Sequence, residues 1–165
     1  MELSLFRKNF AHVPRHVAVL GLNQGSEIQG VTISSLQSVS VNEQKQILTF
    51  VLKKDSSFSR ILIESGEMTI NFLADNQEEI SKAYSDKDRN GRNEFKAEVW
   101  LRSERNLVFI KGAAFSLSAT FLNLIELEDS NIFFVSADDI IESNERKILM
   151  YSDRSYGAFQ HRKFQ

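Results

Sequence analysis

The sequence predicts a mainly β protein in which an antiparallel sheet closes into a β-barrel, with a few short helices packed at one end. Short apolar or alternating runs recur along the chain and are separated by polar turns, as in all-β domains. Only a few segments carry apolar residues at helical spacing. An antiparallel sheet of roughly seven or eight strands has two exposed edges unless it closes on itself, and closure removes them.

The composition fits one globular domain over residues 1–165, in which residues 157–165 are expected to form a frayed tail. The 20 basic and 22 acidic residues nearly balance, so the chain lacks an electrostatic footprint for nucleic acid. No apolar run reaches the length of a membrane span, and the N-terminus lacks the pattern of a secretory signal. We therefore expect a cytoplasmic protein without nucleic-acid or membrane partners. Because the chain contains no Cys, redox chemistry would rely on a few other side chains or on a bound cofactor.

The first part of the chain is expected to form one helix and three strands. Residues 3–12 have apolar positions at helical spacing and end before Pro14, which favours a short amphipathic helix. The β-rich runs 17–22 and 27–35 flank a polar turn that contains a glycine, as a hairpin does. The run 46–52 is almost continuously apolar, which predicts a central strand.

Two more helices and a strand are expected before the middle of the chain. Asp55 is a preferred helix N-cap type, and the helical pattern that follows stops at Gly66, a preferred C-cap. Residues 68–73 read as a strand and residues 78–84 as a second short helix, whereas the polar residues 85–94 read as an exposed loop.

The second half is expected to be a meander of strands. In residues 115–121, Phe, Leu and Ala alternate with Ser and Thr, which predicts a strand with its hydroxyl face toward solvent. The phase slips near Leu124 and Ile125, which indicates a bulge. The remaining expected elements are strands at 107–110, 132–135 and 148–151 and a turn at 129–131.

Two segments are candidate binding sites on their composition. Residues 29–40 begin as a strand and continue with a dense run of hydroxyl side chains, which could hold a polar planar ligand or simply form a Ser-rich turn. Residues 53–57 place two lysines beside a predicted helix N-terminus, which could hold a phosphate or be an ordinary cap. The pair His12 and His16 has metal-ligand spacing, but Pro14 lies between them, and turn histidines are favoured over a metal site.

The hydroxyl-rich segment resembles a motif of the flavin reductase-like family, whose fold is the FMN-binding split barrel. Residues 30–40, GVTISSLQSVS, are similar to the family's G-[MV]-T-x-[SN]-[SA]-x-x-S-[VL]-S. Residues 65–74, SGEMTINFLA, are similar to its S-G-x-[FM]-x-[VI]-N-x-L-[AS] strand. Weaker matches follow in the family's order, so that the resemblance covers nearly the whole chain: Phe6-Arg7, Ser56-Ser57, Gln77, residues 111–113 and residues 149–156.

The resemblance implies a homodimer that binds FMN or FAD near the subunit interface, and it implies which residues contact the flavin. The residues after Gly30 would line the isoalloxazine ring, and the turn after the strand 46–52 would hold the phosphate. Lys87 is a further candidate, and Asp55 is expected to cap the helix rather than to face a phosphate. By position, the ring set is Thr32, Ile33, Ser34, Ser35, Leu36 and Ser38, and the phosphate set is Lys54, Asp55, Ser56 and Ser57.

The chain departs from the family at two places. Many members have G-D-H before the strand that is 132–135 here, and that His is associated with the nicotinamide side; in this chain Ser130 stands at its position. The family's P-P pair is replaced by residues 43–45, EQK. On the nicotinamide side, Arg154 and Tyr156 remain candidates to receive a dinucleotide.

Three functions stay open at this point. The resemblance implies an NAD(P)H:flavin reductase, with NAD(P)H as co-substrate, that supplies reduced FMN or FAD to a partner monooxygenase. The replacement of the family's His by Ser130 favours the alternative, an FMN-binding electron carrier or flavin-binding protein without NAD(P)H activity. The third is a β-barrel interaction domain that has lost flavin binding.

Overall fold

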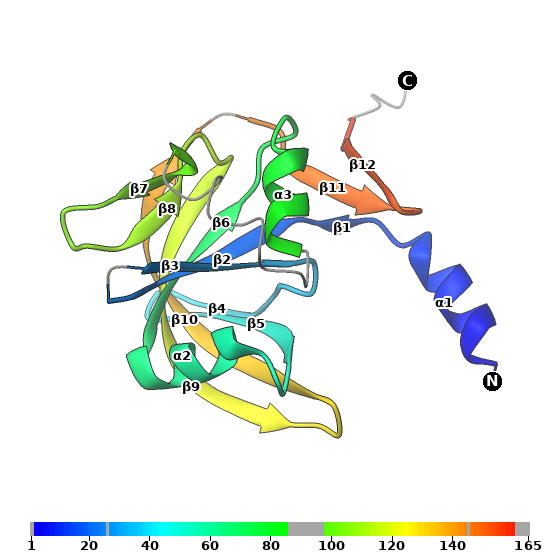
Figure 1. The fold of residues 1–165 in the computed structure, drawn as a ribbon, viewed down its shortest axis with the longest axis horizontal. Coiled ribbons are helices and arrows are strands. Elements are labelled where there is room, and N and C mark those ends of the chain that lie inside the picture. Colours follow the sequence, from blue (N-terminus) through cyan, green and yellow to red (C-terminus); the bar gives the residue numbers. More distant parts are fainter. Residues whose placement is uncertain (1, 26, 86–97, 145, 161–165) are drawn as a thin grey trace.

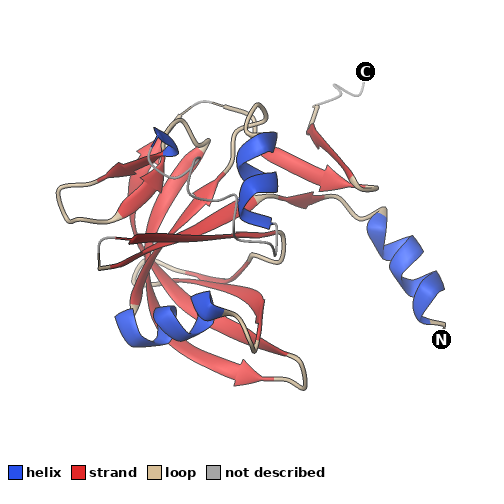
Figure 2. Ribbon diagram, in the orientation of Figure 1, coloured by secondary structure: helices blue, strands red, loops and turns tan. Residues whose placement is uncertain are grey.

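The computed structural model describes residues 2–25, 27–85, 98–144 and 146–160, and its main feature is a seven-stranded antiparallel sheet (Figures 1 and 2). The predicted mainly β fold is confirmed. The strand order is β3-β2-β6-β9-β10-β5-β4. In chain order these strands are β2 (Ala18–Gln24), β3 (Glu27–Ile33), β4 (Gln37–Val41), β5 (Gln46–Lys53), β6 (Glu67–Phe72), β9 (Phe115–Glu126) and β10 (Ser130–Ser143).

The sheet closes because its two edge strands are neighbours in sequence. β3 and β4 lie at opposite ends of the strand order, yet residues 34–36 alone separate them. Four peptide units reach at most roughly 14 Å, so the sheet must curl until its two edges approach each other at this link. We call the link 34–36 and the facing edges of β3 and β4 the seam. β4 shows that the Ser-rich stretch continues as a strand and is not merely a turn.

The inside of the barrel is an apolar core. Phe50 and Phe133 stack there with ring centroids 5.4 Å apart, and both are fully buried. Helix α2 (Ser57–Ser65) packs Phe58 and Leu62 into the same core. Its apolar positions recur at helical spacing, and it ends at Gly66 with φ of 72°, the left-handed conformation that favours glycine.

A second core lies on the outer face of β2 and β6. It contains Val19 and Leu73 and is covered by Tyr84 of helix α3 (Glu78–Ser85) and Trp100 of strand β7 (Trp100–Arg102), which pairs with β8 (Val108–Ile110). The Trp100 indole donates a hydrogen bond of 2.6 Å to the Tyr84 hydroxyl. α2 and α3 therefore pack against two different cores, so the expectation that the helices pack at one end of the barrel is wrong.

The same second core corrects the prediction for residues 115–121. Ser116 and Ser118 face away from the barrel interior as expected, but they are buried rather than solvated. The Ser116 hydroxyl donates to Asn71 Oδ1 at 2.8 Å, and that oxygen also accepts from the backbone of Ile110. Alternation distinguishes the two faces of a strand, but it does not show whether another layer covers the polar one.

One predicted turn and one predicted bulge lie a few residues from their expected positions. Ser130 and Asn131 belong to β10, and the turn closes one step earlier, where the Leu127 amide donates to the Ser130 carbonyl at 2.8 Å. The predicted bulge in β9 is present at Leu122, since Phe134 pairs with Asn123 and Val135 with Phe121.

The ends of the chain form a small separate sheet. Strand β1 (Arg15–His16) pairs with β11 (Leu149–Ser152), which pairs with β12 (Ser155–Ala158). Part of the predicted frayed tail is therefore a strand, and residues 161–165 lie outside the described residues. Helix α1 (Leu3–Ala11) ends before Pro14 as predicted and projects away from the barrel, with none of its residues buried (Figure 1).

Within the described residues, no helix is long and apolar enough to cross a membrane. No group of three or more His, Asp or Glu residues in these parts of the chain could hold a metal ion. The two histidines with metal-ligand spacing have separate surroundings: His12 pairs with Asp153, and the ring of His16 lies 5.3 Å from that of Phe72.

Candidate functional site

The seam offers backbone hydrogen-bonding groups that no described strand uses. Among the described strands, β3 pairs with β2 alone and β4 with β5 alone, so each has one edge that no described strand covers. An edge strand carries a row of N–H and C=O groups that can bind another molecule. The link 34–36 lies where these two edges come together, and Ser34 and Ser35 are half-buried there.

Most of the predicted ring-binding residues have a defined structural setting at this seam. The Thr32 hydroxyl donates to the Ser81 carbonyl of α3 at 2.8 Å, which fixes α3 beside β3. Ile33 and Leu36 point into the barrel core and are buried. Ser38 is exposed on β4, next to a register shift between Ser38 and Ser40.

Ser35 connects the seam to the end of β5. Its hydroxyl oxygen accepts a hydrogen bond of 3.0 Å from the Val51 amide and lies 3.4 Å from the Val51 carbonyl. Val51 is three residues before Lys54, where the predicted phosphate-binding segment begins. The structure therefore brings the predicted ring segment and the predicted phosphate segment to the same part of the molecule.

The phosphate segment leads into a helix whose first turn lacks a side-chain cap. The N-cap residue is Ser56, not Asp55 as predicted, and Ser56 makes no side-chain capping hydrogen bond among the described residues. Asp55 is exposed. Lys54 pairs with Glu126 at 3.2 Å, and its amide donates to the Asp129 carbonyl. Because Ser56 provides no side-chain cap, the positive end of the helix dipole can act on a bound anion.

Arg60 is a further residue at this place, and sequence reasoning missed it. Ser57 and Arg60 both line a polar hollow of about 230 Å³ between α2 and the β2–β3 hairpin, together with Gln24, Gln29, Ile61 and Glu64. Residues three apart on a helix share a face, so the spacing of Ser57 and Arg60 was the available signal.

The three residues predicted for the nicotinamide side lie in different surroundings. Ser130 is paired with Lys53 across β10 and β5, beside the phosphate segment. The Tyr156 hydroxyl lies 3.0 Å from the Ser81 hydroxyl on α3. Ser81 also accepts the hydrogen bond from Thr32 through its carbonyl, so Ser81 contacts both residues. Arg154 lines a hollow beside α1. Lys87 lies outside the described residues.

His16 is a second residue that sequence reasoning missed, because it was interpreted only as a turn histidine. Its ring is half-buried beside Phe72, which stacks on Phe115 at 4.1 Å. Its Nε2 atom is buried and has no hydrogen-bond partner among the described residues. Burial lowers the pKa of His16 below its ordinary value, so the ring is neutral near pH 7.

His16 also lies close to the seam along the chain. Ala18 pairs with Ile33 across β2 and β3, and His16 precedes Ala18 by two residues, whereas the link 34–36 directly follows Ile33. On the exposed face of α3, hydrogen bonds from Lys82 to Glu78 and Glu79 raise the pKa of that lysine.

Comparison with known proteins finds similarity to flavin reductases over nearly the whole chain. The family model described as flavin reductase like domain matches residues 10–160. A flavin reductase of Pseudomonas putida is 23% identical over 155 residues, which cover 93% of this chain and 88% of that protein.

Solved structures share the fold. The NADH:FAD oxidoreductase of Streptomyces globisporus C-1027 superposes with a TM-score of 0.81 at 24% identity, covering 94% of this chain and 92% of that one. The styrene monooxygenase flavin reductase of Pseudomonas putida S12 superposes with a TM-score of 0.83 at 17% identity, covering 96% and 99%. Since the family model spans most of the sequence and the seam carries the motif residues, the chain belongs to the flavin reductase-like domain family.

Proposed function

We propose that this protein is an NAD(P)H:flavin reductase that binds FMN or FAD at the seam and supplies reduced flavin to a partner monooxygenase in the cytoplasm. The observation that carries the proposal is the seam itself, where Ser35 and Val51 join the ring segment to the phosphate segment. Membership of the family and the similarity to a flavin reductase of P. putida support it.

The residues at the seam fit a flavin. Its ring has a polar edge with donors and acceptors, which the unpaired edges of β3 and β4 and the hydroxyls of Ser34 and Ser35 complement without adding charge. Its phosphate fits the uncapped start of α2 with Ser56, Ser57 and Arg60. This ligand would lie along the strand edges at the link 34–36 and at the start of α2.

The chain's own residues would bind and orient rather than react. When bound, a flavin supplies the hydride acceptance and electron delivery of such an enzyme. Thr32 fixes α3 against β3 through Ser81, which keeps the wall of the site in place. Buried Ile33 and Leu36 anchor both ends of the link in the barrel core, so the backbone groups between them hold their positions.

The test is an anaerobic titration of the protein with FMN, with FAD and then with NADH or NADPH, followed in the visible absorption band of the flavin. Binding of one flavin per chain and loss of this band on addition of a nicotinamide cofactor are expected. Retention of the oxidised spectrum at millimolar NADH and NADPH would contradict the reductase activity.

One observation favours a second function, a flavin-binding electron carrier without nicotinamide activity. Ser130 stands at the position where the family resemblance implies a His, and it lies beside Lys53 with its hydroxyl 2.9 Å from the carboxylate of its neighbour Asp129. A protein that binds flavin and is reduced by dithionite but by neither NADH nor NADPH would support this function instead.

A homodimer is part of the proposal. Val39 and Val41 on β4 are 56% and 70% exposed, which is apolar surface that a second copy can cover. Sedimentation equilibrium should give twice the chain mass of 18.9 kDa. A mass equal to that of one chain would refute the dimer.

A further inference from the structure

A hollow of about 280 Å³ lies between helix α1 and the small sheet β1–β11–β12, away from the seam residues. Three aromatic rings and three guanidinium groups line it, and the described lining includes no carboxylate: Phe6, Phe10, Tyr151, Arg7, Arg15 and Arg154. We call this place the arginine hollow. Aromatic surface beside unneutralised guanidinium groups is the chemistry that recognises a ligand with both a flat ring and a phosphate.

Arg7, Arg15 and Arg154 form no salt bridge with any residue that the structure describes. Arg15 lies over the Phe10 ring at 5.4 Å, and its Nε is buried without a hydrogen-bond partner in the described chain. An unsatisfied buried donor is unfavourable, and an anionic acceptor bound in the hollow would satisfy it.

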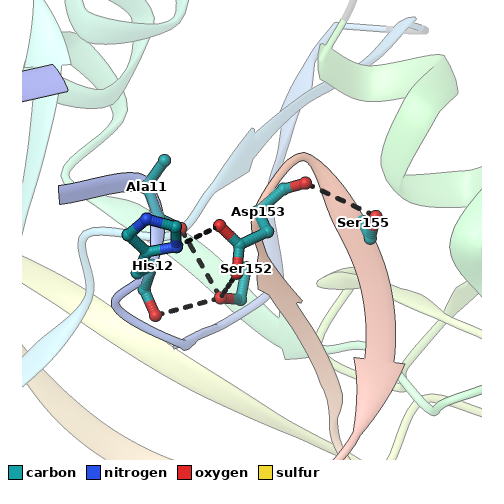
Figure 3. A network of polar contacts seen from close by, with 5 residues as sticks. All are labelled: Ala11, His12, Ser152, Asp153 and Ser155. Atoms are coloured by element: carbon teal, nitrogen blue, oxygen red, sulfur yellow. Dashed lines mark hydrogen bonds and ion pairs between the residues drawn. The ribbon is translucent and has the colours of Figure 1, made fainter. Parts of the chain in front are cut away.

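The walls of the arginine hollow are fixed to each other by the polar network of Figure 3. The Asp153 amide donates to the Ala11 carbonyl at 2.8 Å, and the Ser152 hydroxyl donates to the His12 carbonyl at 3.1 Å. His12 Nδ1 lies 2.5 Å from the carboxylate of Asp153. The end of α1 is thus held on the β11–β12 turn, and Asp153, the acid nearest Arg154 in sequence, is occupied by His12.

The turn that presents Arg154 has an unfavourable backbone. Ser152 pairs with Ser155, so Asp153 and Arg154 form a two-residue hairpin turn, with φ of 52° and 60°. Such a turn favours Asn and Gly, and Arg in the left-handed region is uncommon. A non-glycine residue kept in that conformation points to a role for its side chain.

We propose that the arginine hollow binds the adenosine phosphate end of the nicotinamide dinucleotide, with the adenine ring against Phe6 and Phe10 and the phosphates on the guanidinium groups. This inference rests on the proposed function. The two rings are 42% and 47% exposed and stack on each other at 5.3 Å, so they offer an accessible aromatic surface.

Chain connectivity joins this place to the seam. Arg15 lines the hollow and comes three residues before Ala18 in β2. Ala18 pairs with Ile33, and the link 34–36 follows Ile33 directly. In this proposal, the remainder of the dinucleotide lies along β1, toward the predicted ring site.

The first test measures ADP-ribose binding by isothermal titration calorimetry, because this probe carries the adenosine diphosphate but no nicotinamide. The key variant is Arg154→Gly, which removes the guanidinium and gives the turn the residue that its φ favours. Loss of a charge-assisted contact should weaken binding about tenfold or more, with an unchanged or higher melting temperature.

Lys8→Ala is the matched control. It removes one positive charge from the same helix but does not line the hollow, so ADP-ribose binding should stay within twofold of wild type. Arg154→Lys keeps the charge without the planar fork and should give an intermediate affinity. Equal binding by wild type and Arg154→Gly, or equal weakening by Lys8→Ala, would overturn the proposal.

The second test measures steady-state kinetics with NADH and NADPH. Arg154→Gly should raise the KM for the nicotinamide cofactor about tenfold or more with little change in kcat and in flavin affinity. Unchanged KM in a variant of an active reductase would overturn this inference and leave the proposed function intact. If the wild type oxidises neither cofactor, the proposed function fails, and unweakened ADP-ribose binding to Arg154→Gly would then overturn the hollow separately.

Discussion

The seam and the arginine hollow offer a ligand opposite kinds of chemistry. The seam presents neutral groups, namely the edges of β3 and β4 and the hydroxyls of Ser34 and Ser35. The hollow presents three guanidinium groups and aromatic rings. Neutral dipoles held by a rigid barrel suit a planar ring whose charge changes during a reaction, whereas fixed cations suit phosphates. In the proposed function, the seam orients the reacting ring and the arginine hollow holds the other substrate.

The largest effect is expected from a change that breaks the wall of the seam alone. A Cβ at Gly30 would lie 2.7 Å from the Tyr84 ring, so Gly30→Val must push α3 away from β3. We expect the free energy of unfolding in urea to fall by about 1–3 kcal/mol. Under conditions in which Gly30→Val is folded, its affinity for FMN should be lower than that of wild type, and its affinity for ADP-ribose should be unchanged.

Gly157→Ala is the control for this prediction. Nothing lies within 4 Å of a Cβ built at Gly157, so the substitution should change the unfolding free energy by less than about 0.5 kcal/mol. Similar stability losses in the two variants would contradict the packing argument.

A second comparison separates the flavin ring at the seam from the flavin phosphate at the start of α2. Arg60→Ala should raise the Kd for FMN about tenfold and leave the Kd for riboflavin, which has no phosphate, unchanged, because Arg60 lines the hollow with Ser57. Fluorescence titration with both flavins measures this. Equal weakening of both would place Arg60 near the ring or assign it a structural role.

The Ser35 hydroxyl connects the predicted ring segment to the end of β5, which leads to the predicted phosphate segment. Ser35→Ala removes the acceptor of the Val51 amide and should weaken both FMN and riboflavin several-fold, with about 1 kcal/mol of lost stability. Ser40→Ala is a matched control, since Ser40 is half-buried on the same stretch and makes no hydrogen bond through its side chain in the described structure. Unchanged flavin binding by Ser35→Ala would refute the bridging role.

The smallest effect is expected from the pH dependence of His16, which lies between the two places. Burial depresses its pKa in the folded state below the ordinary 6.5. The unfolded chain therefore takes up the proton first as the pH falls, and stability is complete above 6.5 and decreases below it. Urea unfolding between pH 7 and pH 5 should show a smaller loss in His16→Gln than in wild type. Identical slopes for the two proteins would contradict the burial effect.

Much of the fold could be predicted from local patterns. The helix before Pro14, the β2–β3 hairpin around Gly25 and the bulge in β9 follow from turn chemistry and period, and each is present. The burial of Ser116 and Ser118 could not be predicted, because only the tertiary fold brings Ile110 of β8 to Asn71, whose Oδ1 also accepts from Ser116.

The candidate site shows the same limit. The motif in residues 30–40 indicates the ring segment, but its closeness to residues 54–57 depends on the Ser35–Val51 contact, which continues the antiparallel β4–β5 pairing beyond Gln37 and Thr49. Arg60 and His16 had weak sequence signals, since a single helix spacing and a lone histidine are common. The arginine hollow draws residues from both ends of the chain, and no local pattern connects Arg7 with Arg154.

The most direct test of the account is a double-mutant comparison of steady-state kinetics in wild type, Ser35→Ala, Arg154→Gly and the combined variant. We expect Ser35→Ala to raise only the KM for flavin and Arg154→Gly to raise only the KM for NADH. The combined variant should show both increases, each of the same size as in the single variant. A variant that raises both constants, or effects that exchange places, would contradict the division of the two substrates between the seam and the arginine hollow.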